Sequence, residues 1–162
     1  MKDRINRLLL HDAWVKGDTH RWAAVAERHL AEVDRSDPDL VWQYCWYIVK
    51  LGNPERMEEA VYWAEVALEN KSAWEGDQHV ERVYGLHKFR ATAAFRHWEY
   101  LEARYAEVSG LDKLRIVEEA RNELKTFAKE WLSYARSAGR DPSEAMRLCE
   151  MAAGTESFCS DP

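Results

Sequence analysis

A long amphipathic pattern between residues 80 and 108 constrains the fold of this chain more than any other feature. Apolar and aromatic residues recur there at alternating steps of three and four, the spacing of one face of an α-helix. No proline interrupts the stretch, and its one glycine, Gly85, lies near the start. The pattern therefore predicts a helix of about 30 residues with a packing seam along one side. The seam residues are Val80, Tyr84, His87, Ala91, Ala94, Trp98, Leu101, Tyr105 and Val108.

A second pattern of the same kind runs from about residue 111 to residue 138, and only Ser109 and Gly110 separate it from the first. A short break between two long helical patterns is typical of an antiparallel hairpin. The two seams should then pack at the shallow angle of coiled-coil pairs. We therefore expect a long helical hairpin in the C-terminal half of the chain. The second seam consists of Val117, Ala120, Leu124, Phe127, Trp131, Tyr134 and Ala138.

Shorter helical patterns fill the rest of the chain, with glycine, proline and capping residues between them. The sequence predicts an all-α fold of about seven helices, which form a single domain over residues 1–153. Residues 154–162 are small and polar, so we expect a frayed or disordered tail. Besides the hairpin, the expected helices are residues 3–15, 19–33, 38–51, 55–69 and a short one from about 143 to 153.

Composition excludes several classes of function. The net charge of −6 disfavours a general nucleic-acid binder. No run approaches the ~18 apolar residues that a membrane span needs, so we expect no direct membrane insertion. The three cysteines are far apart and form no CxxC pair, which indicates neither a zinc site nor a disulfide framework. The default location is cytoplasmic, and a periplasmic or envelope-associated domain of a longer protein is the alternative.

The sequence contains no pattern that is typical of a catalytic or metal site. Its six histidines form no HExxH motif and no His-x3-His pair on one helical face. No Ser/His/Asp or Cys/His arrangement and no glycine-rich phosphate loop occurs. His87 lies on the long seam, where we expect a core histidine that is hydrogen-bonded to a neighbour. We therefore expect neither an enzyme, nor a metal, nor a cofactor.

Two turns of the chain repeat the same phrase. They are Val15-Lys16-Gly17-Asp18 and Val49-Lys50-Leu51-Gly52-Asn53, and their glycines lie 35 residues apart. This distance is close to the roughly 34-residue period of helix-turn-helix repeats. Small residues follow the second turn at Ala60, Ala64 and Ala67, where they allow helices to approach closely.

These features resemble the tetratricopeptide repeat family. Residues 38–70 carry the clearest copy, with Trp42 at the aromatic position of the first helix and the three alanines at the small positions of the second. Trp46 stands where the family usually has a small residue. Residues 3–36 are a weaker copy, and residues 78–138 are a stretched one. The resemblance implies a right-handed superhelix of helix pairs, whose concave groove is lined by the first helix of each pair and holds peptides or partner proteins.

The positions that would face this groove contain no acidic residue, although the chain as a whole is acidic. A cationic groove with aromatic edges suits an acidic peptide or a terminal carboxylate. The alternative is a solvated face whose charge is offset by glutamates on neighbouring helices. The family's carboxylate clamp needs an asparagine that has no match here, since Tyr44 is the nearest residue. The candidate binding residues are Arg7, His11, Tyr47, Lys50, Arg82, Leu86, Phe89 and Arg90.

Trp74 is an aromatic residue within a polar loop that we expect over residues 70–77. Two alternatives are open: the indole folds back over the end of a helix pair, or it stands exposed as an anchor for a partner.

The sequence thus predicts a protein–protein interaction module, a scaffold or adaptor that binds an acidic peptide or another protein. The alternative is a structural or self-association module, either a homodimer through the long hairpin or one segment of a longer repeat array. Residues 66–98 are also similar to repeat modules of bacterial envelope and motility assemblies, which implies a bacterial source.

Overall fold

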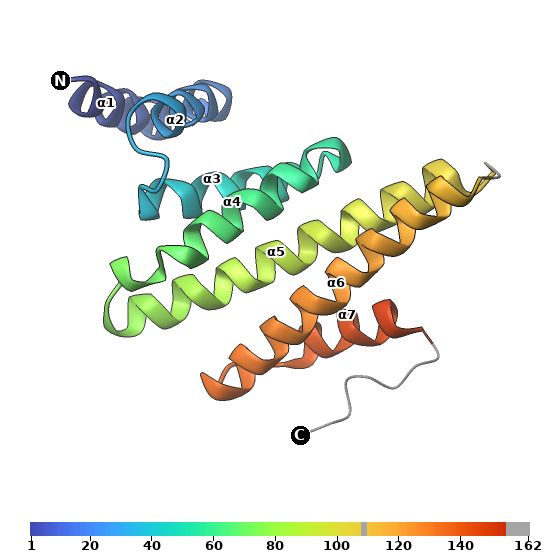
Figure 1. Cartoon of the computed structure of the whole chain (residues 1–162). Coiled ribbons are helices and arrows are strands. Elements are labelled where there is room, and N and C mark those ends of the chain that lie inside the picture. The colour runs from blue at the N-terminus through green and yellow to red at the C-terminus, as the bar shows by residue number, and fades with distance from the viewer. Residues whose placement is uncertain (108–109, 155–162) are drawn as a thin grey trace.

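The computed structural model describes residues 1–107 and 110–154, which form helices joined by short turns (Figure 1). No strand occurs among these residues, and the seven α-helices that they form confirm the all-α prediction. The helices are α1 (Lys2–Val15), α2 (Thr19–Glu32), α3 (Pro38–Leu51), α4 (Met57–Glu69), α5 (Gly76–Tyr105), α6 (Leu111–Ser137) and α7 (Ser143–Ala153). Two 3-10 turns, η1 (Pro54–Arg56) and η2 (Lys71–Ala73), precede α4 and α5.

The helix ends lie where the sequence has capping residues. Asp37 caps α3, because its carboxylate accepts a hydrogen bond from the Leu40 amide at 3.1 Å, and Pro38 fills the first helical position. Gly52 ends α3 at a φ of 70°, a left-handed conformation that disfavours any side chain. The start of α5 differs from expectation. The helix begins at Gly76 rather than near residue 80, so the loop before it is shorter than predicted.

The two longest helices form the predicted antiparallel hairpin. In Figure 1, α5 and α6 run side by side in opposite directions over most of their length. Leu124 and Trp131 of α6 are completely buried in the seam, and the Trp131 and Tyr84 rings form a T-shaped contact with 6.0 Å between centroids. The last described helix, α7, packs against α6 through Ala145 and Leu148, which extends the core. The predicted ends Val108 and Ser109 lie outside the described residues.

The middle of the molecule is built around small residues on α4. Ala60, Ala64 and Ala67 are buried almost completely, as their spacing predicted. They let α4 approach both α3 and α5, between which it lies (Figure 1). The core of the N-terminal half is therefore continuous from α3 through α4 to α5.

The first helix pair, α1 and α2, joins this body mainly where α2 packs against α3. Three antiparallel pairs thus follow one another along the chain, and a superhelix of the tetratricopeptide type stays a prediction. The expected tail lies outside the described residues except for Gly154. Within the described part, none of the helices combines the length and the apolar character that crossing a bilayer requires.

Candidate functional site

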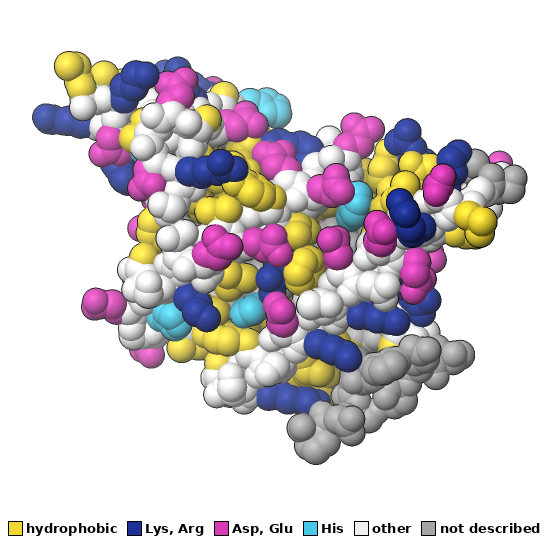
Figure 2. All heavy atoms as spheres, viewed as in Figure 1, with side chains coloured by type: hydrophobic (Ala, Val, Ile, Leu, Met, Phe, Trp, Pro, Cys, Tyr) yellow, Lys and Arg dark blue, Asp and Glu magenta, His cyan; other side chains and the backbone are white. Residues whose placement is uncertain are grey.

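An open cavity, which we call the tryptophan pocket, lies between the α1–α2 turn and α3. Its volume is about 530 Å³ and its lining is almost entirely apolar. Hydrophobic side chains are visible on the surface between the α1–α2 pair and the helices below it (Figure 2). The lining consists of Ala13, Trp14, Gly17, Asp18, Thr19, Trp22, Trp42, Gln43, Trp46 and Tyr47.

Helix α3 supplies one wall of the pocket. Residues 42, 43, 46 and 47 share one face of the helix because they are spaced by one turn. The opposite wall comes from the end of α1 and the start of α2, where the Trp22 ring lies 5.7 Å from the Tyr47 ring. The Trp14 and Trp46 side chains are exposed to solvent. The pocket therefore combines rings that are fixed in the core with rings that a ligand can reach.

Helix α5 holds Trp42 in place from behind. The Arg82 guanidinium lies 4.3 Å from the centre of the Trp42 ring and pairs with Asp39 at 3.6 Å. The Phe89 ring lies at 5.5 Å. The backbone also comes close, since a Cβ atom at Gly85 would lie 3.2 Å from the indole nitrogen. These contacts fix the orientation of one pocket ring before any ligand binds.

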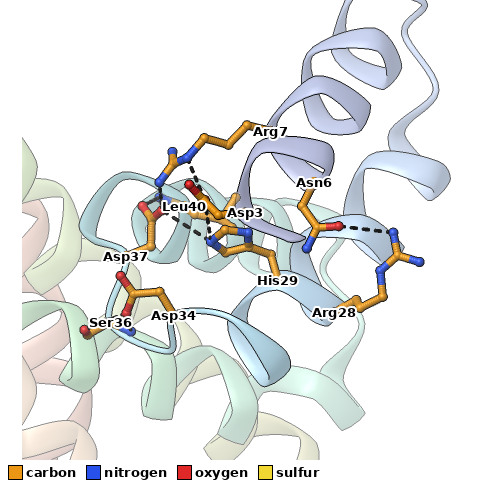
Figure 3. Close-up of polar contacts among 9 residues, drawn as sticks. All are labelled: Asp3, Asn6, Arg7, Arg28, His29, Asp34, Ser36, Asp37 and Leu40. Carbon is orange, nitrogen blue, oxygen red and sulfur yellow. Dashed lines mark hydrogen bonds and ion pairs between the residues drawn. The ribbon is translucent and has the colours of Figure 1, made fainter. Parts of the chain in front are cut away.

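A polar cluster of Asp3, Arg7, His29 and Asp37 joins the opposite ends of the same three helices (Figure 3). Arg7 of α1 donates hydrogen bonds to Asp3 at 2.9 Å and to Asp37 at 2.8 Å. The buried His29 of α2 places its Nε2 atom 3.5 Å from Asp37, the capping residue of α3. The α1–α2 pair is thus tied to α3 at this end, and the tryptophan pocket opens toward the other.

Lys50 supplies positive charge beside the tryptophan pocket. Its ammonium lies 4.5 Å from the centre of the Trp46 ring, a cation–π contact on an exposed side chain. No carboxylate in the described part of the chain forms an ion pair with it. The charge is therefore available to a ligand that occupies the pocket.

The structure separates the eight residues that the sequence grouped in one groove. Tyr47 lines the tryptophan pocket, and Lys50 lies over the Trp46 ring at its edge. Arg7 belongs to the polar cluster, Arg82 lies behind the pocket wall, and His11 is exposed on α1 outside the pocket lining.

The other three residues are buried, so their placement in an open groove is wrong. Leu86 and Phe89 pack in the core of the N-terminal half. Arg90 lies over the Phe127 ring at 4.3 Å and pairs with Glu130. The physical reason is that α4 and α6 cover this side of α5, a long-range packing that the local charge pattern does not contain.

Trp74 is buried rather than exposed. Its side chain is 5% exposed, and its indole nitrogen donates a hydrogen bond to Asp39 at 3.3 Å. The reading of Trp74 as an exposed anchor is therefore wrong, because η2 turns the ring back onto the start of α3.

The residues that sequence reasoning missed are the four tryptophans of the pocket. Two signals could have found them. Eight tryptophans are many for a chain of 162 residues. Trp46 also occupies a position where the repeat pattern favours a small residue, and a bulky ring there opens space between neighbouring helices.

His87 has the most strongly lowered pKa among the histidines of the described residues. His87 is half-buried beside the Tyr134 ring, and its Nδ1 lies 3.4 Å from the Arg90 guanidinium. Burial lowers the pKa of His87 to about 4, with further lowering by the charges of Arg90 and Lys71. In residues 1–107 and 110–154, His, Cys, Asp and Glu do not gather in groups of three that could hold a metal ion.

Comparison of the chain with protein-family models, with curated proteins and with solved structures finds no match. The fold and the pocket define an all-helical protein with an open, aromatic cavity near its N-terminal helix pair.

Proposed function

We propose that this protein is a protein–protein interaction module, and that it binds a short segment of a partner in the tryptophan pocket. The observation that carries the proposal is the cavity itself. A volume of about 530 Å³ lies within the range of ligand-binding pockets. Tryptophan and tyrosine are also the residues that contribute most to binding at protein interfaces.

The lining favours a large apolar side chain from the partner. Trp14 and Trp46 expose ring faces to water, and covering them with an aliphatic or aromatic side chain removes that apolar surface from solvent. Because Trp42 and Trp22 are already held by the core, little side-chain ordering remains to oppose binding.

Charge favours an acidic residue next to that apolar side chain. Lys50 has its ammonium over the Trp46 ring and no carboxylate partner in the described residues. The proposed ligand is therefore an apolar-acidic segment. The proposed ligand is still acidic, as the sequence predicts, but its binding site is the tryptophan pocket. Arg82 and Arg90 are not part of this site, because their charges are already paired.

The test is a selection of random peptides displayed on phage, carried out on the wild-type protein and on a Trp46→Ala variant. Peptides enriched on the wild type alone should share an aromatic or long aliphatic residue with an acidic neighbour. Trp46→Ala should weaken the binding of a synthetic copy by at least about tenfold, as expected for an exposed central aromatic residue. Lys50→Glu should weaken peptides with the acidic neighbour and leave those with a neutral neighbour unchanged.

Tyr62→Ala is the matched control. Tyr62 lies on α4, outside the pocket lining, and is 37% exposed, against 38% for Trp46. The Tyr62→Ala substitution removes an aromatic ring of similar exposure and should leave peptide binding unchanged. Peptides that bind Trp46→Ala as tightly as the wild type would contradict the proposal.

A further inference from the structure

Helix α1 presents an apolar outer face that no other part of the described chain covers. Ile5, Leu8 and Val15 share this face because they are spaced by whole turns, and all three are exposed. The opposite face of α1 packs against α2. Neighbouring exposed apolar side chains of this kind are typical of a surface that another protein surface covers.

The outer face of α1 also carries one exposed cation without an ion-pair partner in the described residues. Residues 2–16 contain four lysines and arginines against two aspartates. Lys16 pairs with Asp12, Lys2 pairs with Glu32 of α2, and Arg7 pairs with both Asp3 and Asp37. Arg4 lies beside Ile5, is exposed, and forms no ion pair within the described residues.

The free end of the α5–α6 hairpin carries two exposed carboxylates beside a hollow. A hollow of about 620 Å³ lies there between the end of α5 and the start of α6. Leu114, which lines it, and Leu111, the first residue of α6, are both exposed. Glu99 and Glu102 are exposed on its rim and form no ion pair within the described part of the chain. The lining also contains one cation, Lys113, whose ammonium lies 5.6 Å from the centre of the Tyr105 ring. The lining residues are Glu99, Glu102, Ala103, Tyr105, Ala106, Lys113, Leu114 and Val117.

We infer that the outer face of α1 in one copy docks into the hairpin hollow of a second copy. Both surfaces expose apolar side chains, and the charged groups that lack ion-pair partners within the described residues are opposite, so contact brings Arg4 toward the glutamates of the rim. Two α1 faces, or two hairpin ends, would instead bring like charges together.

The geometry makes this contact a head-to-tail one. Figure 1 shows α1 and the free end of the hairpin at distant places on the molecule, so the two surfaces of one chain cannot contact each other. Each copy keeps one free surface after the first contact. Association therefore continues into an open chain unless it closes as a ring.

The test is sedimentation equilibrium of the full chain from low micromolar to millimolar concentration, with Leu8→Glu and Leu114→Glu variants. These residues are 63% and 64% exposed, so both variants should fold normally. The wild type should gain mass as its concentration rises. Each variant alone should stay monomeric, because each lacks one half of the contact. An equal mixture of the two should form a dimer and stop there, since each chain supplies the one surface that the other retains.

Each alternative has its own result. A symmetric dimer through α1 would be abolished by Leu8→Glu and unaffected by Leu114→Glu, and a symmetric dimer through the hairpin end would show the reverse. Either result would overturn the inference. The inference would also fail if the mixture of the two variants stayed monomeric, or if the wild type were monomeric at the highest concentration. Met151→Glu, at an exposed apolar residue of α7, should leave association unchanged.

Charge exchange gives a second test of the same contact. Arg4→Glu and Glu102→Arg should each weaken self-association by about tenfold, and added salt should weaken that of the wild type. Mixing the two variants should restore association, because each contact then joins opposite charges again. A mixture no stronger than the separate variants would contradict the pairing of these two surfaces.

Discussion

Asp37 is the residue where the local and the long-range interactions of this fold meet. One carboxylate oxygen caps α3 by accepting the Leu40 amide hydrogen at 3.1 Å. The other accepts a hydrogen bond from Arg7 at 2.8 Å and lies 3.5 Å from His29 Nε2. Replacing this buried side chain by alanine removes both functions, and replacing it by asparagine removes only the charge, since asparagine is an equally good capping residue.

The losses in the free energy of unfolding of the two variants should therefore differ by the contribution of the N-cap. Loss of an N-cap costs about 1 kcal/mol. The ion pair with Arg7 adds up to about 1 kcal/mol, because water screens the exposed guanidinium. Asp37→Ala should thus lower the free energy of unfolding by about 2 kcal/mol, and Asp37→Asn by at most about 1 kcal/mol. For a chain of this size the alanine variant should melt roughly 6 °C below the wild type.

The assay is urea denaturation followed by tryptophan fluorescence and far-ultraviolet circular dichroism. The two signals should change together if unfolding is two-state. Arg7→Gln should cost slightly more than Asp37→Asn, because it also removes the exposed pair with Asp3. Combining the two variants should cost little more than Arg7→Gln alone, because both remove the Arg7–Asp37 pair. Equal losses for Asp37→Ala and Asp37→Asn would refute the role of the cap, and a loss below about 0.5 kcal/mol for the alanine variant would refute both roles.

Two further predictions concern α5. The pKa of His87 is about 4 in the folded protein and about 6.5 in the unfolded chain. The unfolded state therefore binds more protons below neutral pH, so stability is full above about pH 6.5 and falls by about 2 kcal/mol by pH 5. His87→Gln should remove this part of the pH dependence of urea unfolding. Gly85→Val should destabilise the fold by about 2 kcal/mol and shift the tryptophan emission, because even a Cβ atom there would lie 3.2 Å from the Trp42 ring; unchanged emission and stability would contradict that packing.

The elements of the fold were predictable because their signals are local. Helix α3 begins at Pro38 and ends at Leu51, as the capping aspartate and the glycine indicated. The hairpin followed from two seams and one short break. The faces that remain exposed were not predictable in this way, because they depend on which helix covers which. The buried Arg90 pairs with Glu130, forty positions away, and nothing near Arg90 in the sequence indicates that partner.

The tryptophan pocket also combines features that local sequence patterns predict with features that depend on long-range packing. The side chains on α3 share a face by helical spacing alone, and that face was already expected to bind at Tyr47 and Lys50. The opposite wall depends on how the α1–α2 pair is set against α3. That setting comes from the polar cluster around Asp37 and from the Trp22–Tyr47 contact, which join residues far apart in the chain. Part of the site could therefore be predicted from the sequence, but the cavity could not.

The changed positions of the basic residues also change what a charge-reversal experiment measures. On sequence grounds, reversing Arg82 and Arg90 tests ligand binding at an open groove. In the structure, Arg82 supports the Trp42 ring, and Arg90 is buried against Phe127 with a glutamate partner. A carboxylate at position 90 would be buried without a cationic partner and would lie beside Glu130, which is strongly destabilising. Lost binding in such variants would then reflect a damaged fold. Lys50 does not have this difficulty, because its charge is exposed and lacks a carboxylate partner among the described residues, so Lys50→Glu can change ligand affinity while the free energy of unfolding stays constant.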